Sequence, residues 1–169
     1  GLPDLMITDA SNARRHESWD INGAYVFSRG AMYFDNGSYS CEVSLRDVVE
    51  NTATYACDSF TIDLTAPVVT GLSTDAPRYS LDGPHSLITV TFQSTELLEN
   101  TSVSLGAGNF TCQWASAGAD YAYTCGYQLS DFDIGPNEER SATIAVAASD
   151  AAGNVTSQSV TVFLDTKPP

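Results

Sequence analysis

The sequence contains few charged residues, and very few of them are positive. Only 17% of its 169 residues are charged, and 7 Lys and Arg stand against 21 Asp and Glu, which gives a net charge of −14. Nucleic acids and anionic membrane surfaces repel such an acidic chain, so neither is an expected partner. The low charge content argues against a helical protein, whose surface normally carries many Lys, Glu and Arg. A hydrophobic content of 43% argues against disorder.

Long apolar runs and catalytic motifs are also missing. No run of 18 or more apolar residues occurs, so we expect no direct membrane insertion. The two histidines, His16 and His85, lie in polar and turn-like sequence, with no Ser or Cys in a nucleophile motif nearby. The sequence has no phosphate-binding loop and no zinc-protease motif. It therefore predicts a protein that is not an enzyme, with His16 in a polar loop.

What the sequence does contain is a series of short segments in which apolar and polar residues alternate. A period of two is typical of half-buried β-strands, and no segment shows the period of an amphipathic helix. Turn sequences such as Asn22-Gly23 and Asp82-Gly83-Pro84 separate the segments. Many short strands spaced in this way predict a β-sandwich or a barrel. The expected strands are Leu5–Thr8, Ala24–Ser28, Ala31–Phe34, Tyr39–Leu45, Tyr55–Leu64, Val68–Leu72, Ser86–Gln93, Ser102–Leu105, Asn109–Trp114, Tyr121–Gln128, Ala142–Ala148 and Gln158–Leu164.

The four cysteines form two pairs, and each pair brackets a predicted hairpin. With the first turn centred on Val49, Cys41 and Cys57 lie opposite each other, and the second hairpin aligns Cys112 with Cys125 in the same way. Cβ atoms that face each other on antiparallel strands are about 4.5–5.5 Å apart, so we predict the disulfides 41–57 and 112–125. Disulfides indicate an oxidising compartment outside the cytosol. Four buried free thiols are the alternative.

The two halves of the chain share a pattern. Leu45–Asn51 and Ala148–Asn154 each end in an Asp-x-x-x-Asn sequence that follows a predicted strand. The next strand then leads in both halves to an Asp-x-x-x-Pro sequence, which begins at Asp63 in the first half and at Asp165 in the second. A repeated unit of strand, turn, strand and linker predicts two related domains in series.

The domain boundary is expected near the first linker, which gives a domain at residues 1–65 and another at 66–169. The first is short for a seven-stranded sandwich, which needs about 100 residues. Its disulfide, the second domain or a strand donated by a neighbouring chain could complete it, and donation would pair with an exposed sheet edge. The second linker, at Lys167–Pro169, suggests that the chain is part of a longer protein.

Four motifs follow one another in the second half. They are the linker Asp63–Val69, the strand Ile88–Glu96, the turn Asp150–Asn154 and the second linker that begins at Asp165. In this order they resemble the immunoglobulin-like extender domains of large bacterial surface adhesins. The resemblance implies an all-β protein of two tandem immunoglobulin-like β-sandwich domains, of which the first is short or incomplete. It also implies that calcium at the junctions stiffens the string of domains.

Three acidic side chains are expected to meet at one end of the second domain. Successive strands of a sandwich run in opposite directions, so the loop with Glu96 and the turn with Asp150 reach the end at which the linker residue Asp63 enters. Ca²⁺ takes about six to eight oxygen ligands, which these carboxylates, Asn154 and backbone oxygens could supply. In the alternative interpretation Asp150 and Asn154 only form hydrogen bonds within their turn, and Asp63 caps a strand.

The sequence also contains four acceptor motifs for N-glycosylation. Such motifs arise by chance in a chain rich in Ser and Thr, and they are compatible with a secreted protein. The acceptor residues are Asn36, Asn100, Asn109 and Asn154.

Aromatic residues are concentrated in the first domain. Aromatic side chains can form a surface that binds a glycan or a protein, or they can form a core. Alternation places Tyr25 and Phe27 on the same face of a strand, which favours a core. The residues concerned are Trp19, Tyr25, Phe27, Tyr33, Phe34 and Tyr39.

Together these features predict a structural or adhesive segment of a secreted or cell-surface protein, with an immunoglobulin-like stalk that Ca²⁺ makes rigid between its domains. The expected partners are neighbouring immunoglobulin-like domains. One alternative is a subunit of an extracellular filament or pilus, assembled from identical subunits by strand exchange. The other is a head module that binds a surface glycan or a protein.

Overall fold

The computed structural model describes residues 4–8, 14–17, 34–47, 49–82 and 85–168. Every regular element in these residues is a β-strand, so the predicted all-β fold is confirmed. The chain divides into two compact units, Gly1–Thr65 (unit 1) and Ala66–Pro169 (unit 2). In the part of the chain that the structure describes, no helix is long and apolar enough to cross a membrane.

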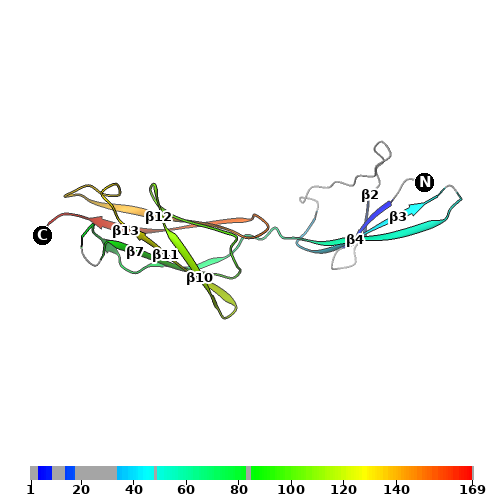
Figure 1. Ribbon diagram of the computed structural model, residues 1–169, viewed down its shortest axis with the longest axis horizontal. Coiled ribbons are helices and arrows are strands. Elements are labelled where there is room, and N and C mark those ends of the chain that lie inside the picture. The colour runs from blue at the N-terminus through cyan, green and yellow to red at the C-terminus, as the bar shows by residue number, and fades with distance from the viewer. Residues whose placement is uncertain (1–3, 9–13, 18–33, 48, 83–84, 169) are drawn as a thin grey trace. The chain divides into compact units, whose positions relative to one another are not determined.

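The described residues of unit 1 form one antiparallel sheet of four strands (Figure 1). The strands are β1 (Asp4–Thr8), β2 (Arg14–Glu17), β3 (Gly37–Arg46) and β4 (Thr52–Ile62), in the order β2-β1-β3-β4. The prediction of a polar loop around His16 is wrong, because His16 lies on β2 opposite Met6 of β1. A strand at the edge of a sheet is held by backbone hydrogen bonds, so it does not need the alternating apolar residues by which strands are found in a sequence.

The buried cluster found among the described residues of unit 1 is small and aromatic. Phe34 and Tyr39 are buried, with ring centroids 5.0 Å apart, and Phe60 stacks on Tyr39 at 5.4 Å. The side chains from Thr52 to Ser59 of β4 are all exposed. Phe34 and Tyr39 therefore form a core, as favoured for the aromatic residues. The other aromatic residues named in the sequence analysis lie outside the described residues: Trp19, Tyr25, Phe27 and Tyr33. The predicted strand Ala24–Ser28 and residues 31–33 of the predicted strand Ala31–Phe34 also lie outside them.

Unit 2 is a sandwich of two sheets that carry the core between them (Figure 1). One sheet has the order β10-β11-β7-β5 and the other the order β6-β13-β12-β8-β9. In an immunoglobulin domain these correspond to the sheets DEBA and GFC, with the short strand β6 added beside G and the short strand β9 added beside C. The strands are β5 (Val69–Thr74), β6 (Arg78–Tyr79), β7 (Leu87–Ser94), β8 (Asn100–Leu105), β9 (Gly108–Asn109), β10 (Thr111–Ala117), β11 (Asp120–Gln128), β12 (Glu139–Ser149) and β13 (Val155–Asp165).

Buried and more exposed side chains alternate strictly on the central strands, and the buried ones fill the space between the two sheets. β7 buries Ile88, Val90 and Phe92, while the side chains between them are more exposed. β12 buries every second residue from Ala142 to Ala148. Full burial of a side chain of the size of Ile88 contributes about 1.5–3 kcal/mol. This rigid pair of sheets fixes the ends of the loops that carry the acidic residues.

Each unit contains one disulfide between adjacent strands. Cys41 on β3 lies opposite Cys57 on β4, with Cα atoms 5.1 Å apart. Cys112 on β10 lies opposite Cys125 on β11, with Cα atoms 4.0 Å apart. Both cysteine pairs therefore have the hairpin register inferred from the sequence.

Candidate metal site

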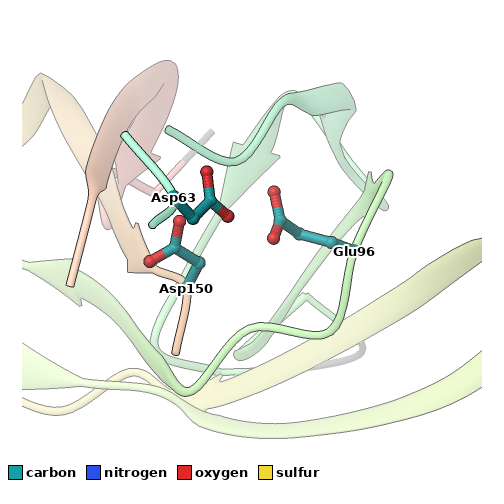
Figure 2. A group of neighbouring side chains, drawn as sticks. All are labelled: Asp63, Glu96 and Asp150. Atoms are coloured by element: carbon teal, nitrogen blue, oxygen red, sulfur yellow. The ribbon is translucent and has the colours of Figure 1, made fainter. Parts of the chain in front are cut away.

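Three carboxylates from distant parts of the sequence lie together. Asp63 follows β4, Glu96 lies in the loop after β7, and Asp150 begins the turn between β12 and β13. One oxygen of each carboxylate lies within 4.8 Å of the other two. Figure 2 shows that the three groups face one another. The topology of the sandwich explains why Glu96 and Asp150 lie close together, because β7 and β12 both end at this end of unit 2.

Asp150 is held by the turn in which it lies. Its side chain is buried, and its two oxygens accept hydrogen bonds of 2.9 Å from the backbone N–H and the side-chain amide of Asn154. The hydrogen bond from the side-chain amide of Asn154, together with those from backbone N–H groups of the turn, lowers the pKa of the Asp150 carboxyl. Burial of the group has the opposite effect. The carboxylate is therefore charged and fixed in direction at neutral pH.

Asn154 is thus a donor to Asp150 through its amide nitrogen. This is part of the alternative interpretation, in which the Asp-x-x-x-Asn sequence makes hydrogen bonds within its own turn. Because the turn orients the Asp150 carboxylate toward Asp63 and Glu96, the hydrogen bonds and a metal site are compatible. That Asn154 itself supplies an oxygen ligand stays a prediction.

The loop that carries Glu96 is fixed at both ends. Ser94, at the end of β7, is buried, and its hydroxyl accepts a hydrogen bond from the Glu96 N–H at 3.4 Å. The Glu99 N–H donates to the carbonyl of Ser149 at 2.8 Å, which joins the loop to the end of β12. Glu96 and Asp150 are therefore positioned by one connected set of backbone contacts.

Asp63 lies in a segment that its own side chain and Asn36 shape. The Asp63 carboxylate accepts a hydrogen bond from the Thr65 N–H at 2.9 Å. The side-chain oxygen of Asn36 accepts one from the Leu64 N–H at 2.6 Å, and the Asn36 amide donates to the Thr65 hydroxyl. The chain after β4 is therefore a structured turn, in which one oxygen of Asp63 is engaged with the backbone.

The same turn occurs in unit 1. Asp47 accepts hydrogen bonds from the backbone N–H of Asn51 at 2.9 Å and from its amide at 2.7 Å. The amide of Asn51 is also the main reason why the pKa of Asp47 is lowered. In both turns the residue before the Asn has a positive φ, which is 71° at Glu50 and 88° at Gly153. The sequence repeat is therefore a structural repeat.

The linker aspartates repeat as well, but their surroundings differ. Asp165 accepts a hydrogen bond from the Lys167 N–H at 3.1 Å, as Asp63 does from Thr65. Asp165 also forms an ion pair of 3.0 Å with Arg78, which in turn lies 3.4 Å from Glu139. Asp165 therefore lies beside a positive side chain of its own unit, whereas Asp63 lies beside two acidic side chains of unit 2.

The four glycosylation motifs differ in how their Asn side chains are engaged. Asn36 and Asn154 use their amides in the bonds described above, and the Asn100 amide donates to the Ser149 hydroxyl at 3.3 Å. Asn109 is exposed at the end of β9. That any of the four carries a glycan stays a prediction.

Comparison with known proteins identifies no family. No protein-family model matches the sequence, and no curated protein matches it. Among solved structures, the chain is similar to the crystal structure of BcpA, the major pilin subunit of Bacillus cereus, with a TM-score of 0.27 and 8% sequence identity. The match covers 96% of this chain and 64% of the pilin chain, so it spans less than two thirds of that protein. Any function of this chain has to be argued from its own residues.

Proposed function

We propose that the chain is a structural segment of an extracellular or cell-surface protein, in which Ca²⁺ is bound by Asp63, Glu96 and Asp150. The single observation that carries the proposal is the approach of the three carboxylates to within 4.8 Å of one another. Charges of the same sign at this distance repel, and a divalent cation with a preference for oxygen ligands removes the repulsion. The two disulfides support an extracellular location.

Calcium bound in this way stiffens the linker. Only Leu64 and Thr65 separate Asp63 from the first residue of unit 2, while Glu96 and Asp150 belong to unit 2 itself. A cation shared by the three side chains ties the end of β4 to unit 2. The proposed role is therefore mechanical, that of a calcium-dependent spacer between neighbouring immunoglobulin-like domains.

Titration calorimetry of the full chain with CaCl₂ tests the site. We expect saturable binding by the wild type and an affinity at least about tenfold lower in Glu96→Gln, which removes one charged ligand. Glu99→Gln is the matched control, because Glu99 lies in the same loop outside the group of three carboxylates. Equal calcium affinities for Glu96→Gln and the wild type, or no binding by the wild type at millimolar Ca²⁺, would reject the proposal.

A second proposed function is that of a filament subunit, and β4 is the observation that favours it. β4 is the outermost strand of the described sheet of unit 1, and its side chains from Thr52 to Ser59 are exposed. An edge strand presents backbone N–H and C=O groups with which a strand of an identical subunit can pair. A segment that polymerises through this edge would form an extracellular fibre.

Light scattering after size exclusion distinguishes the filament from the spacer. We expect concentration-dependent oligomers that Ala56→Lys disrupts, since a lysine on an edge strand opposes pairing. Ala107→Lys, in the exposed turn between β8 and β9, adds the same charge away from this edge. A monomer at the highest concentrations reached would eliminate the filament and leave the calcium proposal intact.

A further inference from the structure

The side of unit 2 between β8 and β10 contains a cavity of about 260 Å³. Leu98 and Tyr123, which are both buried, form its inner side. Other residues that line it are Glu99, Thr101, Gln113 and Trp114. The cavity thus combines a carboxylate and a hydroxyl with one of the two tryptophan side chains of the protein. It is separate from the group of Asp63, Glu96 and Asp150.

Trp114 is exposed and yet held in place. Its side chain is 53% exposed, and its ring meets the edge of Tyr121 at 5.6 Å with an interplanar angle of 71°. It lies on β10 two residues after Cys112, whose disulfide to Cys125 joins β10 to β11. The tip of the β10–β11 hairpin projects beyond the rest of unit 2 (Figure 1). An aromatic side chain fixed in this way makes a contact surface with little further loss of conformational entropy.

The inner side of the cavity is equally rigid. The Tyr123 hydroxyl accepts a hydrogen bond of 2.9 Å from the Leu98 N–H, and the Tyr123 ring stacks on Phe92 at 4.9 Å. The hydrogen bond from Glu99 to Ser149 fixes the backbone beside the Glu99 side chain. The walls are therefore formed before any ligand arrives.

We propose that this cavity binds a neutral sugar ring, such as the terminal hexose of a surface glycan. The C–H bonds on one face of a pyranose carry a slight positive charge and lie flat against the negative π-face of an indole such as Trp114. Sugar hydroxyls need partners that both donate and accept hydrogen bonds, and the Glu99 carboxylate and the Thr101 hydroxyl provide them. A cavity slightly below the range of about 300–1,000 Å³ for drug-sized ligands accommodates one sugar ring.

The charge of the cavity selects among sugars. None of the described residues that line it is positive, Glu99 is acidic, and the chain has a net charge of −14. Sialylated and sulfated glycans are therefore repelled, and neutral ones are favoured. This binding activity goes beyond the proposed calcium-dependent spacer and does not depend on it.

An array of neutral and sialylated oligosaccharides, probed with the full chain, tests the proposal. We expect binding to glycans with neutral terminal hexoses, and a signal reduced at least about tenfold in Trp114→Ala. Phe132→Ala is the matched control, because Phe132 is a fully exposed aromatic residue of the same unit outside this cavity. Failure of the wild type to bind any neutral glycan, or equal binding by Trp114→Ala, overturns the proposal.

Fluorescence provides a second readout that does not depend on the folding of Trp114→Ala. The chain has two tryptophans, so in Trp19→Phe all the tryptophan emission comes from Trp114. Titration of this variant with the best neutral oligosaccharide from the array should shift the emission, and Glu99→Gln should weaken the binding. An unchanged spectrum at saturating sugar refutes the site. Repeating the titration in EDTA separates the two proposals, since loss of calcium binding leaves sugar binding in place.

Discussion

The repeated turn provides its own control for the calcium proposal. Asp150→Asn and Asp47→Asn change the same atom in the same turn, in which each Asp accepts hydrogen bonds from the backbone and the amide of an Asn. Both substitutions weaken the bond to that amide to a similar degree. Only Asp150, however, lies within 4.8 Å of Asp63 and Glu96. We therefore expect Asp150→Asn to abolish stabilisation by calcium and Asp47→Asn to preserve it.

The size of the effect follows from ligand linkage. A ligand present at 100 times its dissociation constant raises the free energy of unfolding by about 2.7 kcal/mol if it binds the folded state alone. For a domain of about 100 residues, the size of unit 2, 1 kcal/mol corresponds to about 4–8 °C in the midpoint of thermal unfolding. The wild type should therefore gain about 10–20 °C on addition of saturating calcium.

Differential scanning calorimetry at pH 7, in CaCl₂ and then in EDTA, measures the shift. The transition that calcium moves should be that of unit 2, because Glu96 and Asp150 belong to it. The reasoning is refuted if the wild type unfolds at the same temperature in both buffers. It is also refuted if Asp150→Asn keeps the full calcium shift, since the carboxylate would then not be a ligand.

Three further predictions concern the stability of the two units. Burial, and then the hydrogen bond to Asp75, raise the pKa of Tyr79 to about 12. The unfolded value is about 10, so the stability that neutral Tyr79 contributes is complete below pH 10 and is lost as the pH rises toward 12. Thermal melts across this range should show a steeper loss for the wild type than for Tyr79→Phe. Glu50→Gly should stabilise unit 1 by up to about 1 kcal/mol in urea unfolding, because a positive φ costs any residue with a Cβ. Ile144→Ala, in the fully buried centre of β12, should cost unit 2 about 2–5 kcal/mol in the same assay, and a loss below 1 kcal/mol would contradict the packing described.

The sequence was most informative where local geometry determines the contact. The register of a hairpin follows from the position of its turn, so the placement of Cys41 opposite Cys57 could be derived by counting. The alternating direction of strands in a sandwich similarly brought Glu96 and Asp150 to one end of unit 2. Such inferences depend on the backbone path and hardly at all on side-chain packing.

Features that depend on side-chain packing or on sheet edges were not predictable in this way. β2 contains no apolar alternation, because an edge strand is held by backbone pairing. The sequence places Trp114 on a strand, but its exposure depends on the depth to which the two sheets cover β10. Both features result from the assembled sheets, which no local sequence pattern encodes.

The two copies of the Asp-x-x-x-Asn turn have different acidic neighbours. Asp47 has the same hydrogen bonds as Asp150, yet the group of three carboxylates found among the described residues contains only Asp150. Asp165 repeats the linker bond of Asp63 but lies beside Arg78. The turn orients the Asp150 carboxylate, and in the proposed site the neighbouring carboxylates Asp63 and Glu96 complete the ligand set. Calcium affinity should therefore follow the acidic residues on the loop after β7, and a related domain without an equivalent of Glu96 should bind calcium weakly even with an identical turn.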